Sequence, residues 1–227
     1  YKVQFKEGHT LQDGSYTLII EDNAGNRIKG EAEQTFTIET KLPEIDNFIL
    51  ENSTDTGKFE NDRLTHISRP EIVFNSDSGL RVFVKKINQN IDEEDILLKQ
   101  NGVDENPEYD VTSVKTEEGN SKYSISFLED LEDGTYYVIA EDDAGNKNEV
   151  NELIQFVIDK TSPELGPLFM KPQFDTGVSQ TDLLSNLSKP TVSFTSEPGL
   201  TVAVHKNSLD GPSLVKGTDF DAYEGSN

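Results

Sequence analysis

The sequence contains no cysteine and no tryptophan, and only one methionine. Without cysteine the chain has no disulfide, no thiol nucleophile and no zinc–thiolate site, although this absence does not decide the compartment. The sequence also has no apolar run of the length that a transmembrane helix needs, and no recognisable signal peptide. Because the chain begins at Tyr1 within an apparent strand, we expect it to be a fragment of a longer protein.

Basic residues are scarce as well. The 227 residues include 20 Lys and Arg against 43 Asp and Glu, which gives a net charge of −23. A protein that binds nucleic acid or anionic lipid must neutralise phosphates with clustered Lys and Arg, and this sequence has no such cluster. Both classes of partner are therefore excluded. Hydrophobic residues make up only 33% of the chain and fall in short patches, which favours several thin domains over one thick domain.

A long internal repeat organises the chain. Seven identical pairs of residues are each separated by 120 positions, without a gap: Gly14 and Gly134, Asp22 and Asp142, Pro43 and Pro163, Asp55 and Asp175, Asp62 and Asp182, Pro70 and Pro190, and Gly79 and Gly199. A unit of this length suits one small domain. The repeat predicts the end of one domain at 1–42, a complete domain at 43–162 and the start of a third at 163–227.

The complete unit has the hydrophobic pattern of β-strands. Apolar residues alternate or run together, with many β-branched and aromatic side chains, over 70–76, 80–87, 123–128, 135–142 and 153–159. Edge strands near 44–52 and 108–114 bring the total to about seven, which is the number expected of an all-β sandwich. For residues 91–102 the sequence leaves two readings open, a short helix capped by Asp92 and an irregular loop.

Three motifs of the repeat resemble a known family. They are "DTG....D" at 55–62, "P.v.F....GL.V.V" at 70–84, and "DGtY.v.A.D.AGN....F.ID...P" at 133–163. The chain is similar to the bacterial immunoglobulin-like repeats of giant surface adhesins of the type I-secreted, Bap-like kind. The resemblance implies tandem immunoglobulin-like β-sandwiches arranged as an elongated rod, an extracellular location and calcium near the junctions between domains. Two positions depart from the pattern, since Glu39 stands where Asp159 predicts Asp, and Asn23 where Asp143 stands.

Acidic residues recur in register. The strand at 135–142 ends in "EDDAGNK" (141–147), and the same string occurs earlier as "EDNAGNR" (21–27). For a single Asp, a turn or a solvated surface position is the better explanation. Close carboxylates repel one another without a cation, however, and calcium takes six to eight oxygen ligands in irregular geometry. The repetition therefore predicts Ca²⁺ ligands at Asp22, Glu39, Asp55, Asp62, Asp142, Asp143, Asp159, Asp175 and Asp182.

The alternating strand directions of an immunoglobulin-like sandwich indicate how these acids group. We expect the turn 141–146 to lie at the end where the chain enters, beside the turn at 76–79, so that Glu39, Asp77, Asp142 and Asp143 share one site. We expect the segment 55–62 at the opposite end, near Asp130, Asp133 and Asp159. Binding by Asp55 and Asp62 alone, within one repeat, is left open.

Catalysis has no support in the sequence. Tyr16 and Tyr136 follow Asp-Gly with the spacing of a tyrosine corner, which is a structural feature. His9, His66 and His205 fall at positions that do not match between repeats, so that neither a catalytic triad nor a zinc site can be assembled, and we expect them to be solvated. The sequence therefore predicts that the protein is not an enzyme.

These observations lead to one functional hypothesis and its alternatives. The chain is expected to be a stalk segment of a bacterial cell-surface adhesin that supports cell adhesion or biofilm formation. Its partners would be the neighbouring repeats, and a distal tip would contact a host or neighbouring cell. Calcium at extracellular, millimolar concentration would fill weak junction sites and stiffen the chain. The alternatives are a module that binds glycan or protein through loops such as 88–107, a self-assembling fibre subunit, and a spacer within a secreted enzyme.

Overall fold

The computed structural model describes residues 2–27, 34–90, 92–117, 119–148 and 154–222. It divides into two compact units, Tyr1–Thr161 and Ser162–Asn227. Every regular element among the described residues is a β-strand. None of these described residues forms a helix with the length and hydrophobicity of a membrane-spanning segment.

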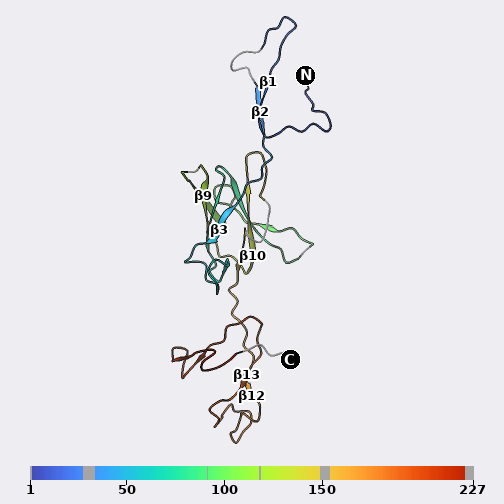
Figure 1. Ribbon diagram of the computed structural model, residues 1–227. Coiled ribbons are helices and arrows are strands. Elements are labelled where there is room, and N and C mark those ends of the chain that lie inside the picture. Colours follow the sequence, from blue (N-terminus) through green and yellow to red (C-terminus); the bar gives the residue numbers. More distant parts are fainter. Residues whose placement is uncertain (1, 28–33, 91, 118, 149–153, 223–227) are drawn as a thin grey trace. The chain divides into compact units, whose positions relative to one another are not determined.

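The complete repeat folds as a sandwich of two sheets (Figure 1). One sheet has the order β4-β11-β10-β6-β7, and the other has the order β3-β5-β9-β8. The first sheet contains β4 (Leu64–Thr65), β6 (Arg81–Lys86), β7 (Ile96–Leu97), β10 (Gly134–Glu141) and β11 (Gln155–Ile158). The second contains β3 (Asp46–Leu50), β5 (Glu71–Ser76), β8 (Tyr109–Lys115) and β9 (Ser121–Phe127). All pairings are antiparallel except that of β4 with β11, which is parallel.

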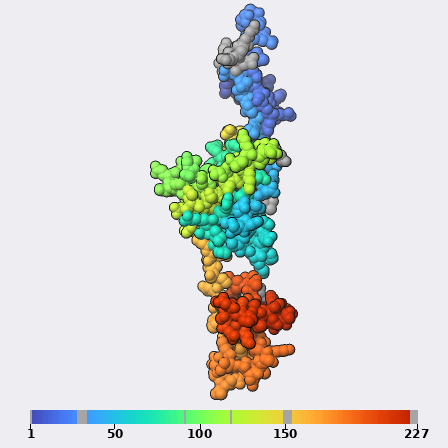
Figure 2. All heavy atoms as spheres, turned by 90° about the vertical axis from the view of Figure 1, so that its left-hand side faces the viewer, coloured from blue at the N-terminus to red at the C-terminus, as the bar shows by residue number. Residues whose placement is uncertain are grey.

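The core lies between these sheets because their strands present alternate side chains to it. In β9 the buried positions are Ser121, Tyr123, Ile125 and Phe127, which alternate with more exposed residues. Central strands β5 and β10 contain longer buried runs. The largest fully buried side chains include Phe74, Tyr109, Tyr123, Tyr136 and Phe156. In Figure 2 this repeat, coloured from cyan to yellow, forms a densely filled body.

All seven expected strands form, and the two placed at edges are at edges. β3 and β8 are the outer strands of their sheet, as the expected strands at 44–52 and 108–114 require. The last expected strand, 153–159, appears as β11 from residue 155, and residue 153 lies outside the described residues. The two-residue strands β4 and β7 were not expected, because two residues are too few to show a hydrophobic period.

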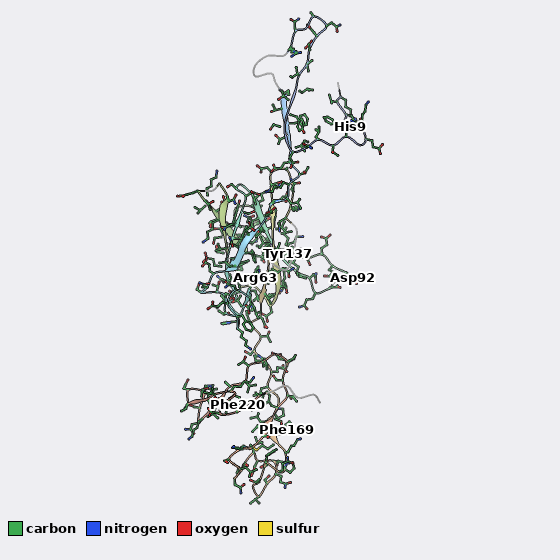
Figure 3. The ribbon with its side chains drawn as sticks, viewed as in Figure 1. His9, Arg63, Asp92, Tyr137, Phe169 and Phe220 are labelled. Carbon is green, nitrogen blue, oxygen red and sulfur yellow. The ribbon has the colours of Figure 1, made fainter. Side chains whose placement is uncertain are left out.

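The interpretation of residues 91–102 as a helix is wrong, and their interpretation as an irregular loop is correct. Residue 91 lies outside the described residues, and the segment from Asp92 contains turns and β7. The backbone makes tertiary hydrogen bonds instead of helical ones, since Leu98 N donates to Val84 O across 3.0 Å. Asp95 accepts hydrogen bonds from Asn88 N and from the Tyr137 hydroxyl, which fastens the loop to β10. Figure 3 shows Asp92 on the part of this loop that projects from the sandwich.

The 120-residue repeat is visible in strand register. β1 (Gly14–Leu18) pairs with β2 (Gln34–Ile38) so that Tyr16 faces Phe36, and 120 positions later Tyr136 of β10 faces Phe156 of β11. Both pairs of rings are stacked, at centroid distances of 5.4 and 5.2 Å. In the second unit, β12 (Phe169–Met170) pairs with β13 (Val192–Ser193) in the register of β3 with β5. The remaining pair there, β14 (Val204–His205) with β15 (Ser213–Leu214), does not follow the register of β6 with β7.

The tyrosine corner forms in both places. The Tyr136 hydroxyl donates to Glu132 O across 2.9 Å, and the Tyr16 hydroxyl donates to Gln12 O across 2.7 Å. In each case the acceptor lies four residues before the tyrosine, and the hydrogen bond closes the segment that leads into the strand. Both tyrosines are structural, as their spacing after Asp-Gly predicted.

Candidate cation-binding sites

The turn after β10 holds its acidic residue with hydrogen bonds from an amide. Asp142 Oδ1 accepts from Asn146 N and Asp142 Oδ2 accepts from Asn146 Nδ2, both at 2.8 Å. Asp142 N donates to Asn146 O, so the two residues also close the turn through the backbone. The side-chain amide of Asn146 is the main reason why the pKa of Asp142 lies below its usual value. The negative charge of Asp142 is therefore compensated by donors of its own turn.

The earlier copy of this turn has the same structure. Asp22 Oδ1 accepts from Ala24 N and Asn26 N, and Asp22 Oδ2 accepts from Asn26 Nδ2. Its pKa is likewise lowered, chiefly by the Asn26 side chain. The conserved spacing from Asp to Asn within each string thus forms an Asx-type turn. A metal-ligand role for Asp22 stays a prediction.

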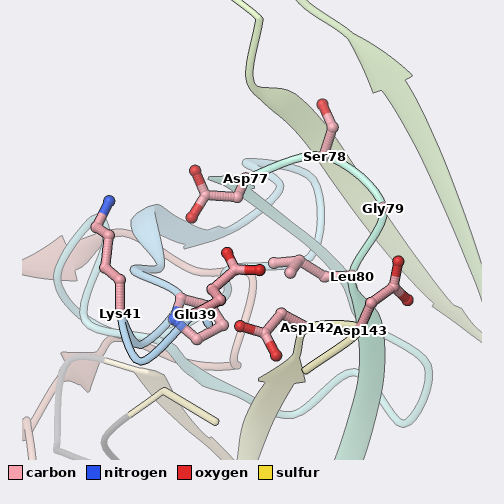
Figure 4. A pocket seen from close by; sticks show the side chains of 9 residues that line it. Glu39, Lys41, Asp77, Ser78, Gly79, Leu80, Asp142 and Asp143 are labelled. Atoms are coloured by element: carbon pink, nitrogen blue, oxygen red, sulfur yellow. The ribbon is translucent and has the colours of Figure 1, made fainter. Parts of the chain in front are cut away.

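Four acidic residues line a pocket of about 220 Å³ at the beginning of the complete repeat (Figure 4). They are Glu39, Asp77, Asp142 and Asp143, with Lys41, Pro43 and the segment Ser78–Leu80 completing the wall. Asn146 Nδ2 also donates to Glu39 O across 3.0 Å, which attaches the segment before the repeat to this turn. The structure therefore brings together the residues that topology assigned to one site. In the close-up, the Glu39 carboxylate appears between those of Asp77 and Asp142.

The acids expected at the opposite end are engaged separately. Asp130 pairs with Arg69 across 2.7 Å and accepts from the Ser68 hydroxyl. Asp133 accepts from Lys160 N and from the Thr161 hydroxyl. Asp159 Oδ1 accepts from Thr161 N. Asp130 and Asp133 thus bind donors from segments distant in sequence, and Asp159 binds a donor of its own turn. In the part of the chain that the structure describes, no group of three or more Asp, Glu or His is arranged to hold a metal ion.

The loop between β3 and β4 contains an acidic side chain with an unpaired oxygen. Asp55 Oδ2 accepts from Asn61 N across 2.8 Å, whereas Asp55 Oδ1 is buried and has no hydrogen-bond partner. Asp62 accepts from Leu64 N through Oδ1 and from Phe59 N through Oδ2. A buried carboxylate oxygen without a partner loses its hydration and gains nothing in exchange.

The same arrangement recurs in the second unit. Asp175 is only 1% exposed, and its Oδ1 is again buried without a partner. Its Oδ2 accepts from Leu183 N across 3.3 Å, and Asp182 Oδ1 accepts from Leu184 N across 3.1 Å. Among the described residues, the oxygens of Asp55 and Asp175 are the two buried side-chain polar atoms left unpaired, and they occupy equivalent positions of the repeat.

A glycine lies beside the second acid of each pair, closely packed in the first loop and in ordinary contact in the second. A Cβ atom on Gly57 would lie 2.4 Å from Asp62 Oδ1 and 2.8 Å from Leu64 O, so only glycine admits this approach. At Gly177 the nearest oxygens to such an atom would be those of Asp182 and Ser179, at 3.4 to 3.6 Å. Carboxylate and carbonyl oxygens that converge in this way are the ligands that calcium prefers. A metal-ligand role for Asp55, Asp62, Asp175 and Asp182 stays a prediction, because no group of three or more acidic or histidine side chains in the described residues is arranged to hold a metal ion.

The histidines are exposed, as expected, but two of them also make hydrogen bonds. His66 Nδ1 lies 2.8 Å from the Thr56 hydroxyl, and His205 Nδ1 lies 3.1 Å from Gly211 O. His9 is exposed (Figure 3).

Two residues of the pocket were not identified from the sequence. Lys41 brings a positive charge to an acidic pocket, and nothing in the repeat indicated it, since Thr161 occupies the equivalent position. Asn146 could have been identified, because "AGN" recurs with Asn26 and because amides often close Asp-containing turns.

Comparison with known proteins agrees with this architecture. A family model described as bacterial Ig-like domain matches residues 42–160, which is just over half of the chain. The chain belongs to the bacterial Ig-like domain family. A search of the curated proteins gave no match. Bacterial Ig-like domains are a non-catalytic fold family and commonly occur in surface or extracellular proteins, where an extender role is consistent with the fold.

Proposed function

We propose that this chain is a stalk segment of a bacterial cell-surface adhesin, in which calcium stiffens the junction between successive Ig-like repeats. The stalk extends a distal adhesive tip toward a host or neighbouring cell and so supports adhesion or biofilm formation. The proposal is supported by one observation above the others: Glu39, which precedes the complete repeat, shares a pocket with Asp77, Asp142 and Asp143 of that repeat.

The pocket supports such a role by gathering acidic side chains, which as they stand are not arranged to hold a metal ion and which a bound cation would have to draw together. Its four carboxylates come from three separate segments of the chain, so that an ion bound to them would cross-link these segments. The Asn146–Glu39 hydrogen bond already joins two of the segments without an ion. Calcium would add to this link at the millimolar concentrations found outside cells, whereas a weak site would be empty in the cytosol.

The glycan-binding alternative gains no support from Tyr109. Tyr109, beside the loop 88–107, is fully buried, and its hydroxyl donates to Val82 O across 3.2 Å. Sugar recognition by stacking needs an exposed ring, so Tyr109 is not available for it. The alternatives of protein binding through this loop and of fibre assembly stay predictions.

Small-angle X-ray scattering of the chain, with millimolar calcium and with excess chelator, tests the proposal. We expect a longer and less flexible particle in calcium. The variant Asp77→Asn/Asp143→Asn should abolish this change, because neither carboxylate makes a hydrogen bond in the described residues that its loss would disrupt. Asp142 is less suitable, since it closes its own turn. Identical profiles with and without calcium would contradict the proposal, and a mass that rises with protein concentration would favour fibre assembly.

A further inference from the structure

The connection between β7 and β8 contains a turn that neither the core nor the acidic pocket uses. Asn101 and Gly102 form this turn, and both are exposed. Among the asparagines of the sequence, Asn101 alone is followed by glycine. Asparagine is a labile residue, because the next backbone nitrogen attacks its side-chain carbonyl carbon. A glycine at the next position has no side chain to crowd that attack.

We propose that Asn101 is a modification site, at which the chain converts its own asparagine to aspartate and isoaspartate without an enzyme. The Gly102 nitrogen loses its proton to hydroxide and forms a bond to Asn101 Cγ. The bond between Cγ and Nδ2 breaks, and Nδ2 takes a proton from water and leaves as ammonia. The product is a cyclic succinimide, in which Gly102 N joins the side-chain and main-chain carbonyl carbons of Asn101.

Water then opens the succinimide in either of two ways. Cleavage of the bond between the nitrogen and Cγ gives aspartate in an ordinary backbone. Cleavage of the bond between the nitrogen and the main-chain carbonyl carbon gives isoaspartate, in which the main chain runs through Cγ. In both cases the chain gains water and loses ammonia, and no atom is oxidised or reduced.

The hydrogen bonds of the turn leave the attacking nitrogen available. The neighbouring nitrogens of Asn101, Val103 and Asp104 all donate to backbone carbonyls. Among the residues that the structure describes, Gly102 N donates to no acceptor, and the Asn101 side-chain amide makes no hydrogen bond. A nitrogen whose proton is held in a hydrogen bond must first lose that bond, which costs free energy. Gly102 N does not incur this cost.

The turn also has room for the ring. Gly102 has a φ angle of 79°, and beyond its chain neighbours no described atom lies within 4 Å of the position that a Cβ would take. Glycine adopts positive and negative φ angles about equally readily, so the backbone can rotate to bring its nitrogen to Cγ. Because both residues are exposed, water and hydroxide reach the reacting atoms.

The two products would affect the fold differently. Aspartate adds a negative charge to a turn that already contains Asp104. Isoaspartate adds one carbon to the main chain between Gln100 O and the two turn nitrogens that bind it. Residues 99–101 also bind the backbone of Tyr109, where the edge strand β8 begins. Isoaspartate should therefore loosen the segment that covers this part of an open strand edge.

The same loop contains a matched internal control. Asn106 is exposed like Asn101, but Pro107 follows it, and proline has no N–H from which the attacking nitrogen could form. Both asparagines lie between Lys99 and Lys115, so trypsin releases them in a single peptide. One mass spectrum therefore compares the two sites in the same sample.

Incubation of the full chain in chelator at several pH values, followed by digestion and mass spectrometry, tests the inference. We expect Asn101 to exchange its amide for a carboxyl group before any other asparagine, at a rate that rises with pH. Asn106 should stay intact. Fragmentation of the peptide should show isoaspartate as well as aspartate at position 101. An unincubated sample corrects for changes during digestion.

Two variants identify the attacking atom. Gly102→Ala keeps the asparagine and crowds the nitrogen, so it should slow the loss of the amide several-fold. Asn101→Gln keeps a side-chain amide but would have to close a larger ring, so position 101 should stay intact. The second variant keeps the inference testable if alanine, which disfavours a positive φ angle, changes the turn.

Three results would overturn the inference. They are equal rates at Asn101 and Asn106, an unchanged rate in Gly102→Ala, and an Asn101 that reacts in guanidinium chloride but stays intact in the folded chain. The last result would mean that the fold protects this turn. Because the reaction proceeds in chelator, its outcome is independent of calcium binding at the pocket and of the proposed function.

Discussion

The side-chain amide of Asn146 donates a hydrogen bond to the backbone carbonyl of Glu39 across 3.0 Å, although 107 positions separate the two residues in the chain. The same amide group also donates to the carboxylate of Asp142. One side chain therefore closes the turn after β10 and attaches the segment that precedes the complete repeat. Five predictions follow from this contact and from the core around it.

Asn146→Asp should destabilise the complete repeat. The substitution replaces an amide donor by a second carboxylate beside Asp142, so that an attraction becomes a repulsion. We expect the melting temperature in chelator to fall by about 5 °C. Asn26→Asp changes the equivalent turn outside the sandwich and is the matched control. It should leave the melting temperature of the sandwich unchanged. Equal melting temperatures of parent and Asn146→Asp would show that the turn is stabilised without this amide.

Lys41→Gln should strengthen calcium binding at the pocket. Lys41 lines the pocket with four acidic residues, and its positive charge opposes the approach of a cation. Removing this exposed positive charge, which repels the ion, should lower the dissociation constant for calcium about two- to five-fold. The dissociation constant is measured from the chemical shift of the Asn146 backbone amide, which binds Asp142, during an NMR titration with CaCl₂. Lys115→Gln, on the exposed part of β8, provides a control for net charge alone. A weaker or unchanged affinity in Lys41→Gln would contradict binding within this pocket.

Tyr136→Phe should cost about 1 to 2 kcal/mol of the free energy of unfolding. The substitution removes the hydroxyl that donates to Glu132 O, while the buried ring and its stacking on Phe156 are retained. Urea unfolding measures the change. Tyr16→Phe removes the equivalent hydrogen bond from the more exposed copy and should affect the sandwich by less than about 0.5 kcal/mol. If both variants change the free energy of unfolding of the sandwich by the same amount, the tyrosine corner at Tyr136 does not stabilise the core.

Phe156→Ala should be the most destabilising of these substitutions, at about 3 to 5 kcal/mol. Phe156 is 1% exposed and stacks on Tyr136 in the core. Its equivalent Phe36 stacks on Tyr16 but is 42% exposed, so Phe36→Ala leaves no enclosed cavity. Urea unfolding of the two variants measures the free energy lost when a buried and an exposed phenylalanine are each replaced by alanine. Equal losses would mean that burial within the sandwich does not set the cost.

Alkaline pH should unfold the complete repeat. Burial raises the pKa of Tyr109, Tyr136 and Tyr137 to about 12, against an ordinary value of 10.0. A raised pKa of an acidic group in the folded state means that the unfolded state releases protons first. The stability that these tyrosines contribute is therefore fully present below pH 10 and is lost between about pH 10 and 12.

Urea unfolding across this pH range checks the alkaline prediction, with tyrosinate absorbance recorded in parallel. The three buried tyrosines should ionise together with unfolding. Tyr137→Phe removes one of these groups and should reduce the slope of stability against pH. A free energy of unfolding that stays constant up to pH 12 would rule out the proposed burial of these hydroxyls.

The strands of the complete repeat could be predicted because their signal is local. Alternation in 123–128 and the apolar runs in 70–76 and 135–142 reflect which side of a strand meets the core. β4 and β7 could not be found in this way, since two residues carry no period and their existence depends on pairing with β11 and β6. The loop at 92–102 was ambiguous for the same reason, because its donors are satisfied by distant acceptors such as Val84 O.

The candidate sites show a similar division. Repetition with an offset of 120 positions pointed to acidic positions whose role as ligands stays a prediction, and the topology of the fold was enough to expect Glu39, Asp77, Asp142 and Asp143 together. The sequence did not indicate that Asp142 is engaged by Asn146 while Asp55 and Asp175 have unpaired oxygens. Both kinds of Asp look alike in the printed sequence, and their hydrogen bonds distinguish them.

The sequence by itself determined the all-β class, the repeat, most of the strands and the set of acidic positions, because each depends on side-chain type and spacing along the chain. The tertiary structure decided which strands pair, which carboxylates are satisfied and where Lys41 lies. Those properties depend on which donors and acceptors from distant segments reach one another, and burial then sets the cost of any oxygen left without a partner.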